Sequence, residues 1–442
     1  MKMQTRRDFL VMSAAVGALC AVSVPAFARS NRAAPRARKA TAVTQVFGDG
    51  IRLIAVAVEY DAPVDAATLS ANDFTVEGRH VTGVFPGTSV DPASRAATGR
   101  FVIVTLSPDD ANASLAQHVQ MQPQKQPQPK AQPQAGGHGP GKAGDIPVYD
   151  TVYRDAKASV VARGAAPLPT TAVSNLIVDA FRQLAFHDPK TGKLLRYNLF
   201  VPKDYDASRS YPLVLFMHDA GATSDVTRTT LFQGLGAVAW ASPQDQAERP
   251  CFVLAPQYAE IITDDDSHTS AMLDTTIDLI EMLARRYSID RKRMYTTGQS
   301  GGCMMSIAMD IKYPDFFAAS FLVAGQWDPA LVKPLARQKL WILVSQDDDK
   351  AWPGENAITA ELEKQGAKVS RAVWDGTWTP KEFETAFAKI DADGSPVNYV
   401  AFRKGTVIPP GQSAAGAAGH RNTWRIAYTI EPIRAWIFRH HA

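Results

Sequence analysis

The stretch RMYTTGQSGG, residues 293–302, decides the fold of this chain. Its first half is apolar and β-branched, as in a buried strand, and the segment CMMSIAMDIKY that follows has helical character. Between them Ser300 stands in the pattern Gly-x-Ser-x-Gly, which turns a strand sharply into a helix and lifts the serine hydroxyl clear of the sheet. The pattern predicts a nucleophile elbow at Ser300. A structural turn around a buried serine is the alternative.

Strands and helices alternate from about residue 175 to the end. Residues 195–202, 211–221, 318–325, 340–346 and 397–402 read as strands. Residues 271–287 carry apolar side chains at the spacing of one helix face: Leu273, Ile277, Ile280, Ala284 and Tyr287. This alternation predicts a mostly parallel sheet, and together with the elbow it predicts an α/β-hydrolase domain over residues 175–442.

A serine hydroxyl becomes a nucleophile when a base takes its proton, and a carboxylate must hold that base. In this fold the partners follow the serine in the order Asp, His. The histidines downstream of Ser300 are His420, His440 and His441. Because the last two stand at the chain end, we predict His420, in a small-residue loop leading into a helix, as the base.

Three carboxylates follow the predicted strand at residues 340–346, namely Asp347, Asp348 and Asp349. We predict Asp349 as the partner of His420, because it stands four residues before Pro353 in the strand-end turn. Asp348 is the alternative, and all three also fit a solvated acidic loop.

Backbone amides are the expected donors to an oxyanion formed at this site. The first predicted donor is the amide of Gly301, the residue after the serine. The second is Ala220, in the loop His218-Asp219-Ala220-Gly221 that follows the predicted strand at 211–217. Asp219 stands where such loops usually carry glycine, and we expect His218 to tie the loop down.

The N-terminal part has a different texture. Short β-branched or aromatic runs separated by turn residues predict a β-sandwich over residues 41–172. A Gln/Pro/Gly-rich stretch around residues 118–145 interrupts it, and its composition predicts a flexible insertion. Because strand-like runs follow this stretch, the insertion is predicted to be a loop inside the sandwich domain.

The first 28 residues read as a twin-arginine export signal. Arg6-Arg7 precede an apolar run that ends in Ala26-Phe27-Ala28, a cleavage pattern. A transmembrane anchor is the alternative. Residues 29–40 are a basic start, expected to be disordered, and the predicted location is periplasmic or extracellular.

Charge and cysteine content narrow the partners and cofactors. Of the formal net charge of +3, residues 1–28 carry +2, which leaves +1 and no indication of nucleic-acid binding. Cys251 and Cys303 remain after cleavage, too few for a disulfide scaffold. No Cys or His cluster has metal-ligand spacing, so neither metal nor organic cofactor is predicted.

The motifs resemble a known group of proteins. YPLVLFMHDAG, RYSIDRKRMYTTGQSGG, VSQDDDKAWP and GHRNTW together resemble secreted serine esterases grouped with polyhydroxybutyrate depolymerases, feruloyl and acetylxylan esterases and prolyl-oligopeptidase-like hydrolases. The resemblance extends to two-domain esterases with an immunoglobulin-like N-terminal domain. It implies a triad of Ser300, Asp349 and His420. Gly301 departs from the bulky residue usual after the serine.

The expected function is cleavage of a small-molecule or polymer-linked carboxylic ester through an acyl-enzyme, without a membrane anchor in the mature form. A prolyl-oligopeptidase-type peptidase and an inactive, binding hydrolase fold are the alternatives. Specificity is expected to depend on loops at residues 222–234, 258–270 and 372–396, with Trp374 and Trp378 either in a pocket or at a core edge. Association of copies through the sandwich domain stays open.

Overall fold

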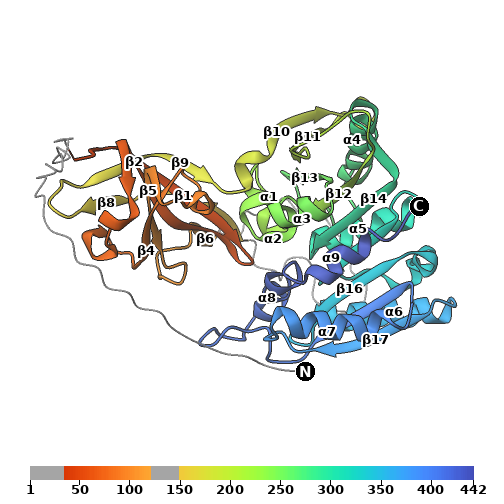
Figure 1. Ribbon diagram of the computed structural model, residues 1–442. Helices are drawn as coiled ribbons and strands as arrows, with labels where there is room; N and C mark the ends of the chain where they lie inside the picture. Colours follow the sequence, from red (N-terminus) through yellow and green to blue (C-terminus); the bar gives the residue numbers. More distant parts are fainter. Residues whose placement is uncertain (1–33, 121–148) are drawn as a thin grey trace, which may run out of the picture.

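The computed structural model describes residues 34–120 and 149–442 (Figure 1). The predicted export signal and most of the predicted insertion lie outside the described residues. Residues 29–40 were predicted to be a disordered start, and the last of them belong to the described residues. For these the prediction was wrong, because strand β1 begins at Ala37. Its pairing with strand β2 covers Ala37 to Phe47, so these residues form backbone bonds within a sheet.

The N-terminal domain is built from strands, as predicted. A seven-stranded sheet has the order β3-β8-β9-β1-β2-β5-β4, and β6 pairs separately with β7. The two strands that flank the Gln/Pro/Gly-rich stretch therefore pair with each other, and the stretch connects them within this domain. The bounds are β1 (Ala37–Phe47), β2 (Gly50–Asp65), β3 (Phe74–Val76), β4 (Val81–Gly87), β5 (Thr98–Leu106), β6 (Ala116–Gln120), β7 (Tyr149–Tyr153), β8 (Ser159–Ala162) and β9 (Leu168–Asn175).

The C-terminal domain contains a nine-stranded sheet of order β10-β11-β13-β12-β14-β15-β16-β18-β17. From β13 to β17 all neighbours are parallel, while β10 and β11 form an antiparallel edge. Every residue of β12, β15 and β16 is buried, as expected for parallel strands covered on both faces. The bounds are β10 (Arg182–His187), β11 (Leu194–Phe200), β12 (Tyr211–Met217), β13 (Phe252–Gln257), β14 (Ile289–Gln299), β15 (Ala319–Val323), β16 (Leu340–Ser345), β17 (Val369–Trp374) and β18 (Val397–Phe402).

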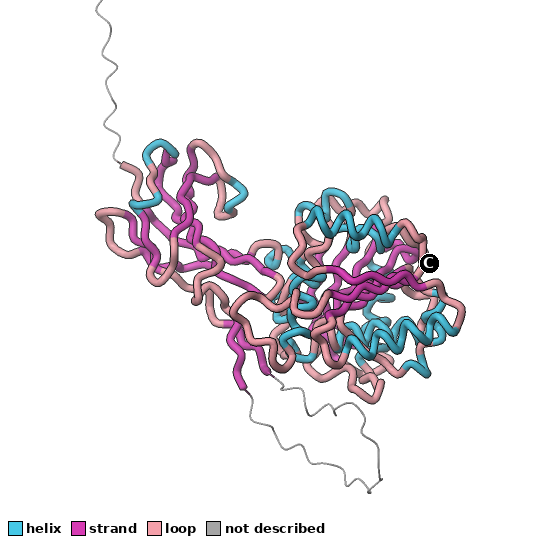
Figure 2. Tube along the Cα trace, turned by 90° about the horizontal axis from the view of Figure 1, so that it is seen from below, coloured by secondary structure: helices cyan, strands magenta, loops and turns pink. Residues whose placement is uncertain are grey.

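Helices cover both faces of this sheet (Figure 2). On α4 the predicted face is buried at Leu273, Ile277 and Ile280. Within the two described segments, no helix has the length and apolar character needed to cross a membrane. The bounds are α1 (Thr229–Phe232), α2 (Leu235–Val238), α3 (Pro243–Glu248), α4 (Met272–Arg286), α5 (Gly301–Lys312), α6 (Ala351–Lys364), α7 (Pro380–Asp391), α8 (Ala418–Ala427) and α9 (Glu431–Ile437).

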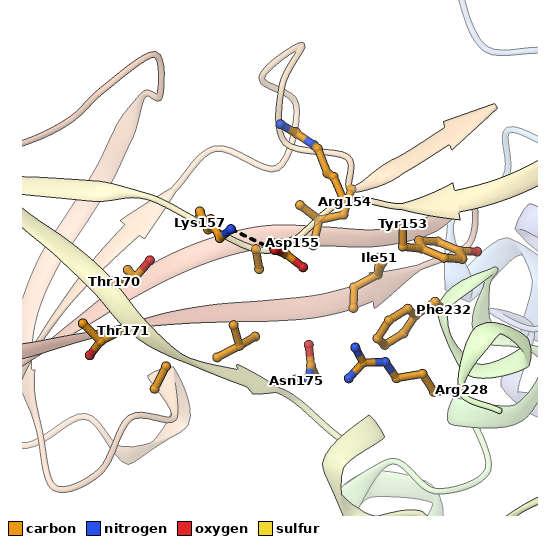
Figure 3. Close-up of a pocket in the computed structure, with 14 residues that line it drawn as sticks. Ile51, Tyr153, Arg154, Asp155, Lys157, Thr170, Thr171, Asn175, Arg228 and Phe232 are labelled. Carbon is orange, nitrogen blue, oxygen red and sulfur yellow. Dashed lines mark ion pairs between the residues drawn. The ribbon is translucent and has the colours of Figure 1, made fainter. Parts of the chain in front are cut away.

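The two domains pack against each other through two hairpins of the sandwich. The turn between β1 and β2 approaches α8 so closely that a Cβ on Gly48 would lie 2.1 Å from the carbonyl oxygen of Arg425. On the other hairpin, the ring of Tyr153 packs edge-on against Phe232 of α1, with 5.2 Å between centroids. A cavity of about 280 Å³ lies along this seam, where Ile51 faces Phe232 (Figure 3).

One buried carboxyl group in α5 makes folding stability depend on pH. Asp310 accepts a hydrogen bond from Ser320 Oγ at 2.7 Å, and its other oxygen is buried without a partner in the described part of the chain. Burial raises the pKa of Asp310 to about 7, although the Ser320 bond opposes this shift. The group is therefore neutral in the folded core at mildly acidic pH.

We predict that Asp310→Asn flattens the dependence of stability on pH. In the unfolded chain Asp310 ionises near pH 4, so its stabilising contribution is complete below that pH and is lost as pH rises to about 7. Melting temperatures across this range should fall less steeply in Asp310→Asn than in the wild type. Asp315→Asn, at an exposed position near the end of the same helix, is the matched control; equal slopes for all three proteins would contradict the prediction.

Candidate active site

Ser300 occupies a strained turn between β14 and α5. Its backbone has φ 53° and ψ −119°, a left-handed conformation that L-residues seldom adopt. The Ser300 amide donates to the carbonyl of Val323 on the neighbouring strand at 3.0 Å, which holds the turn against the sheet. A Cβ on Gly302 would lie 2.0 Å from the carbonyl oxygen of Met217, and one on Gly298 would lie 2.3 Å from that of Gly302. The two glycines of the motif are therefore required by close backbone approach.

The structure brings His420 to Ser300. Its Nε2 lies 2.8 Å from Ser300 Oγ, and its Nδ1 contacts a carboxylate oxygen of Asp348. His420 lies in the first turn of α8 and not in a loop before the final helix, which corrects the sequence prediction. The start of α8 packs tightly on the strand-end turn, since a Cβ on Gly419 would lie 2.3 Å from the carbonyl oxygen of Asp347. This contact places the imidazole between Ser300 and Asp348.

The prediction of Asp349 as the carboxylate partner was wrong. Asp348 is 3% exposed, whereas Asp349 is exposed at the surface of the same turn. The second oxygen of Asp348 accepts the amides of Lys350 at 3.1 Å and Ala351 at 2.9 Å, where α6 begins. These bonds turn the Asp348 side chain inward, and the next side chain along the turn points outward.

The electrostatic surroundings of Asp348 favour a charged carboxylate. Burial by itself raises the pKa of Asp348. Two contributions from His420, its charge and its hydrogen bond, lower this pKa, as do the hydrogen bonds from the amides of Ala351 and Lys350, and together they outweigh burial. The net effect is a pKa below the ordinary value for aspartate. An ionised Asp348 holds the Nδ1 proton of His420, which leaves Nε2 free to accept a proton from Ser300.

The two residues predicted to supply the oxyanion donors, Gly301 and Ala220, are neighbours in the structure. Ala220 begins a short 3-10 helix, η6 (Ala220–Ala222), directly after β12. A Cβ built on Gly301 would lie 3.7 Å from the amide nitrogen of Ala220, so residue 301 and the η6 turn are neighbours. Asp219, at the position usual for glycine, accepts the Gly221 amide at 2.8 Å and so stabilises the turn.

His218 is fully committed to holding the η6 loop. Its Nδ1 lies 2.7 Å from the carbonyl oxygen of Asp219, and its Nε2 accepts the amide of Tyr258 at 3.0 Å. Burial lowers the pKa of His218, consistent with a neutral ring that donates once and accepts once. The predicted tethering role of this histidine agrees with these contacts.

Three further residues noted in the sequence, Trp374, Cys251 and Cys303, are buried. Trp374 is 2% exposed and packs on Trp341 and Trp378, so it belongs to the core edge. Cys251 and Cys303 are buried, free thiols.

In the described segments, potential ligand atoms of three side chains lie within 4.8 Å of one another: Asp264, Asp266 and His268. Asp264 already contacts His268 Nδ1 at 3.1 Å and accepts the amide of Asp266 at 3.0 Å. These groups are exposed or partly exposed, and we assign no metal to them.

Comparison with known proteins identifies the architecture. Residues 39–170 match the family model described as Esterase Ig-like N-terminal domain. The crystal structure of a thermostable esterase superposes with a TM-score of 0.70 and 24% sequence identity, covering 92% of this chain and 100% of that chain. The predicted fold, an α/β-hydrolase domain preceded by an immunoglobulin-like domain, is thereby confirmed. A comparison with curated proteins gives no match.

Two further solved structures have lower scores. A mutant feruloyl esterase module from Clostridium thermocellum, complexed with sinapinate, has a TM-score of 0.39 and 12% identity, covering 57% of this chain and 87% of that chain. An acetyl xylan esterase from Aspergillus awamori has a TM-score of 0.34 and 16% identity, covering 42% and 81%.

We predict that Asp348→Asn slows covalent labelling of Ser300 by a fluorophosphonate on the order of 10³-fold, because the amide no longer holds the reactive tautomer of His420. Asp349→Asn, the adjacent matched control, should label within about twofold of the wild-type rate, since its side chain is exposed. Labelling reactions that are quenched at timed intervals and analysed by mass spectrometry of the intact protein give both rates. Equal rates for the two variants would contradict the assignment of Asp348.

Proposed function

We propose that this two-domain α/β-hydrolase is a serine esterase that cleaves carboxylic esters through an acyl-enzyme. The observation that carries the proposal is the continuous relay from Ser300 Oγ through His420 to the buried Asp348. A serine in a strained elbow, a histidine at 2.8 Å and an inward-turned carboxylate form the arrangement that nucleophilic acyl transfer requires.

In the proposed mechanism, Ser300 Oγ attacks the ester carbonyl while His420 Nε2 takes its proton. Asp348 stabilises the resulting imidazolium and keeps the ring oriented. The amides of Gly301 and Ala220 bind the oxyanion of the tetrahedral intermediate. Collapse releases the alcohol, which receives the proton from His420. Water then attacks the acyl group by the same roles and releases the acid.

An esterase is favoured over an oligopeptidase by the accessory domain. Peptidases of the prolyl-oligopeptidase type carry a large propeller, whereas strands β1 to β9 form one seven-stranded sheet and one pair. The match of residues 39–170 to an esterase N-terminal domain supports the same choice. We further propose export by the twin-arginine signal to the periplasm or exterior, with a small or polymer-linked ester as substrate.

We expect 4-nitrophenyl acetate to give burst kinetics with the wild type, because acylation releases one nitrophenolate per Ser300 before deacylation limits turnover. Ser300→Ala should lose at least about 10⁴-fold in turnover. Ser208→Ala changes an exposed serine far from Ser300 in the sequence and should give the burst amplitude and turnover of the wild type. Stopped-flow absorbance measures the burst amplitude and the steady state.

Three outcomes would contradict the proposal. Unchanged turnover in Ser300→Ala would show that Ser300 is not the nucleophile. Cleavage of a peptide panel with all esters untouched would favour a peptidase. Failure of a fluorophosphonate to label the folded wild type would favour a binding protein with an inactive hydrolase fold.

A further inference from the structure

Thr263 is a buried polar residue beside the proposed oxyanion site that no step of the mechanism above uses. It lies in the connection between β13 and α4 and is 9% exposed. Its hydroxyl donates to the carbonyl oxygen of Gly301 at 3.2 Å. The Thr263 side chain therefore contacts Gly301, the residue immediately after the proposed nucleophile.

The hydroxyl of Thr263 and the amide of Ala220 border the same small volume. A Cβ built on Gly301 would lie 3.3 Å from Thr263 Oγ1 and 3.7 Å from the Ala220 nitrogen. Because residue 301 is glycine, no side chain fills that volume. The Ala220 nitrogen and the Thr263 hydroxyl thus border the open space beside Gly301, the residue that follows Ser300.

The loop that carries Thr263 is fixed in place. Its two sides pair at an isolated antiparallel bridge between Thr263 and Thr269, and the Ser270 amide donates to the carbonyl of Ile262 at 2.9 Å. At its tip, Asp265 accepts a bond from Gln326 Nε2 at 2.7 Å and pairs with Lys350.

Gln326 and Lys350 belong to the segments after β15 and β16, so the loop is anchored across the turn that carries Asp348. A donor held in this way needs little rearrangement during reaction.

The Thr263 hydroxyl can leave the Gly301 carbonyl for another acceptor without leaving that carbonyl oxygen unpaired. The Gly301 carbonyl lies in the first turn of α5, where it accepts a helical N–H from four residues onward. A threonine hydroxyl has one proton and rotates to suit its acceptor. When negative charge develops on the substrate oxygen, a charged acceptor attracts that proton more strongly than the carbonyl does.

We propose that Thr263 is a third oxyanion donor, a catalytic residue whose hydroxyl turns from the Gly301 carbonyl to the oxyanion in the transition state. The inference rests on the proposed esterase function and adds a side-chain donor to the two amides. Its stabilisation exists in the tetrahedral state and not in the ground state, so it acts on kcat more than on KM.

The test compares Thr263→Val, which keeps the shape and removes the hydroxyl, with Thr263→Ser, which keeps the hydroxyl. Thr263→Val should lower kcat for 4-nitrophenyl acetate by about 10- to 100-fold with KM changed less than about threefold, and Thr263→Ser should stay within about threefold of wild-type kcat. Thr269→Val, the same substitution across the bridge at an exposed position, is the matched control and should leave kcat unchanged.

A second readout isolates the tetrahedral state. Ser300 Oγ adds to the boron of phenylboronic acid while His420 takes the hydroxyl proton, which gives a tetrahedral boronate anion with an oxygen in the proposed oxyanion site. Its inhibition constant should rise in Thr263→Val by a factor similar to the fall in kcat, because both report the same lost donor. Where Thr263→Val melts far below Thr269→Val, Thr263→Ala takes its place with the same expectations.

Wild-type kcat in a folded Thr263→Val or Thr263→Ala would overturn the inference, as would an equal loss of kcat in folded Thr263→Ser. Either result leaves Ser300-dependent hydrolysis by the wild type standing. Failure of the esterase proposal is a different result, the lack of Ser300-dependent ester turnover in the wild type itself.

Discussion

The strained turn at Ser300 is the constraint on which the site depends. A non-glycine residue at φ 53° costs free energy, on the order of 1 to 3 kcal/mol, and persists because its surroundings leave it no other conformation. Those surroundings are the bond to Val323 and the backbone contacts that Gly298 and Gly302 permit. The result is a serine hydroxyl that stands above the sheet at the start of a helix.

The other parts of the site reach Ser300 because the sheet is parallel there. The η6 turn follows β12, the loop with Thr263 follows β13, Asp348 follows β16, and α8 with His420 follows β18. In a parallel sheet these carboxyl ends share one edge, where ligands of open α/β sheets bind. Hydrogen bonds between neighbouring connections, such as that from Gln326 to Asp265, then lock the loops to one another.

The immunoglobulin-like domain contacts two of the elements that carry the site. Its β1–β2 turn abuts α8 at Arg425, within two turns of His420, and β7 lies against η6. Burial and the nearby charge of Asp219 both raise the pKa of Tyr153, so this side chain stays neutral in the seam between the domains. Two elements that carry proposed site residues, α8 and η6, are therefore in direct contact with the N-terminal domain.

The sequence by itself determined those features that depend on local pattern or on chain order. The elbow at Ser300 follows from a strand, two spaced glycines and a helix, and His420 follows from the few histidines downstream. Reasoning from the sequence chose the wrong carboxylate. Asp348 and Asp349 are chemically identical, and they differ only in that the start of α6 turns the side chain of Asp348 inward. Such reasoning also gave no sign of Thr263, and left Trp374 undecided between pocket and core. Side-chain direction within a turn, and proximity between loops far apart in the chain, arise when the sheet assembles and its connections pack, so tertiary structure alone decided them.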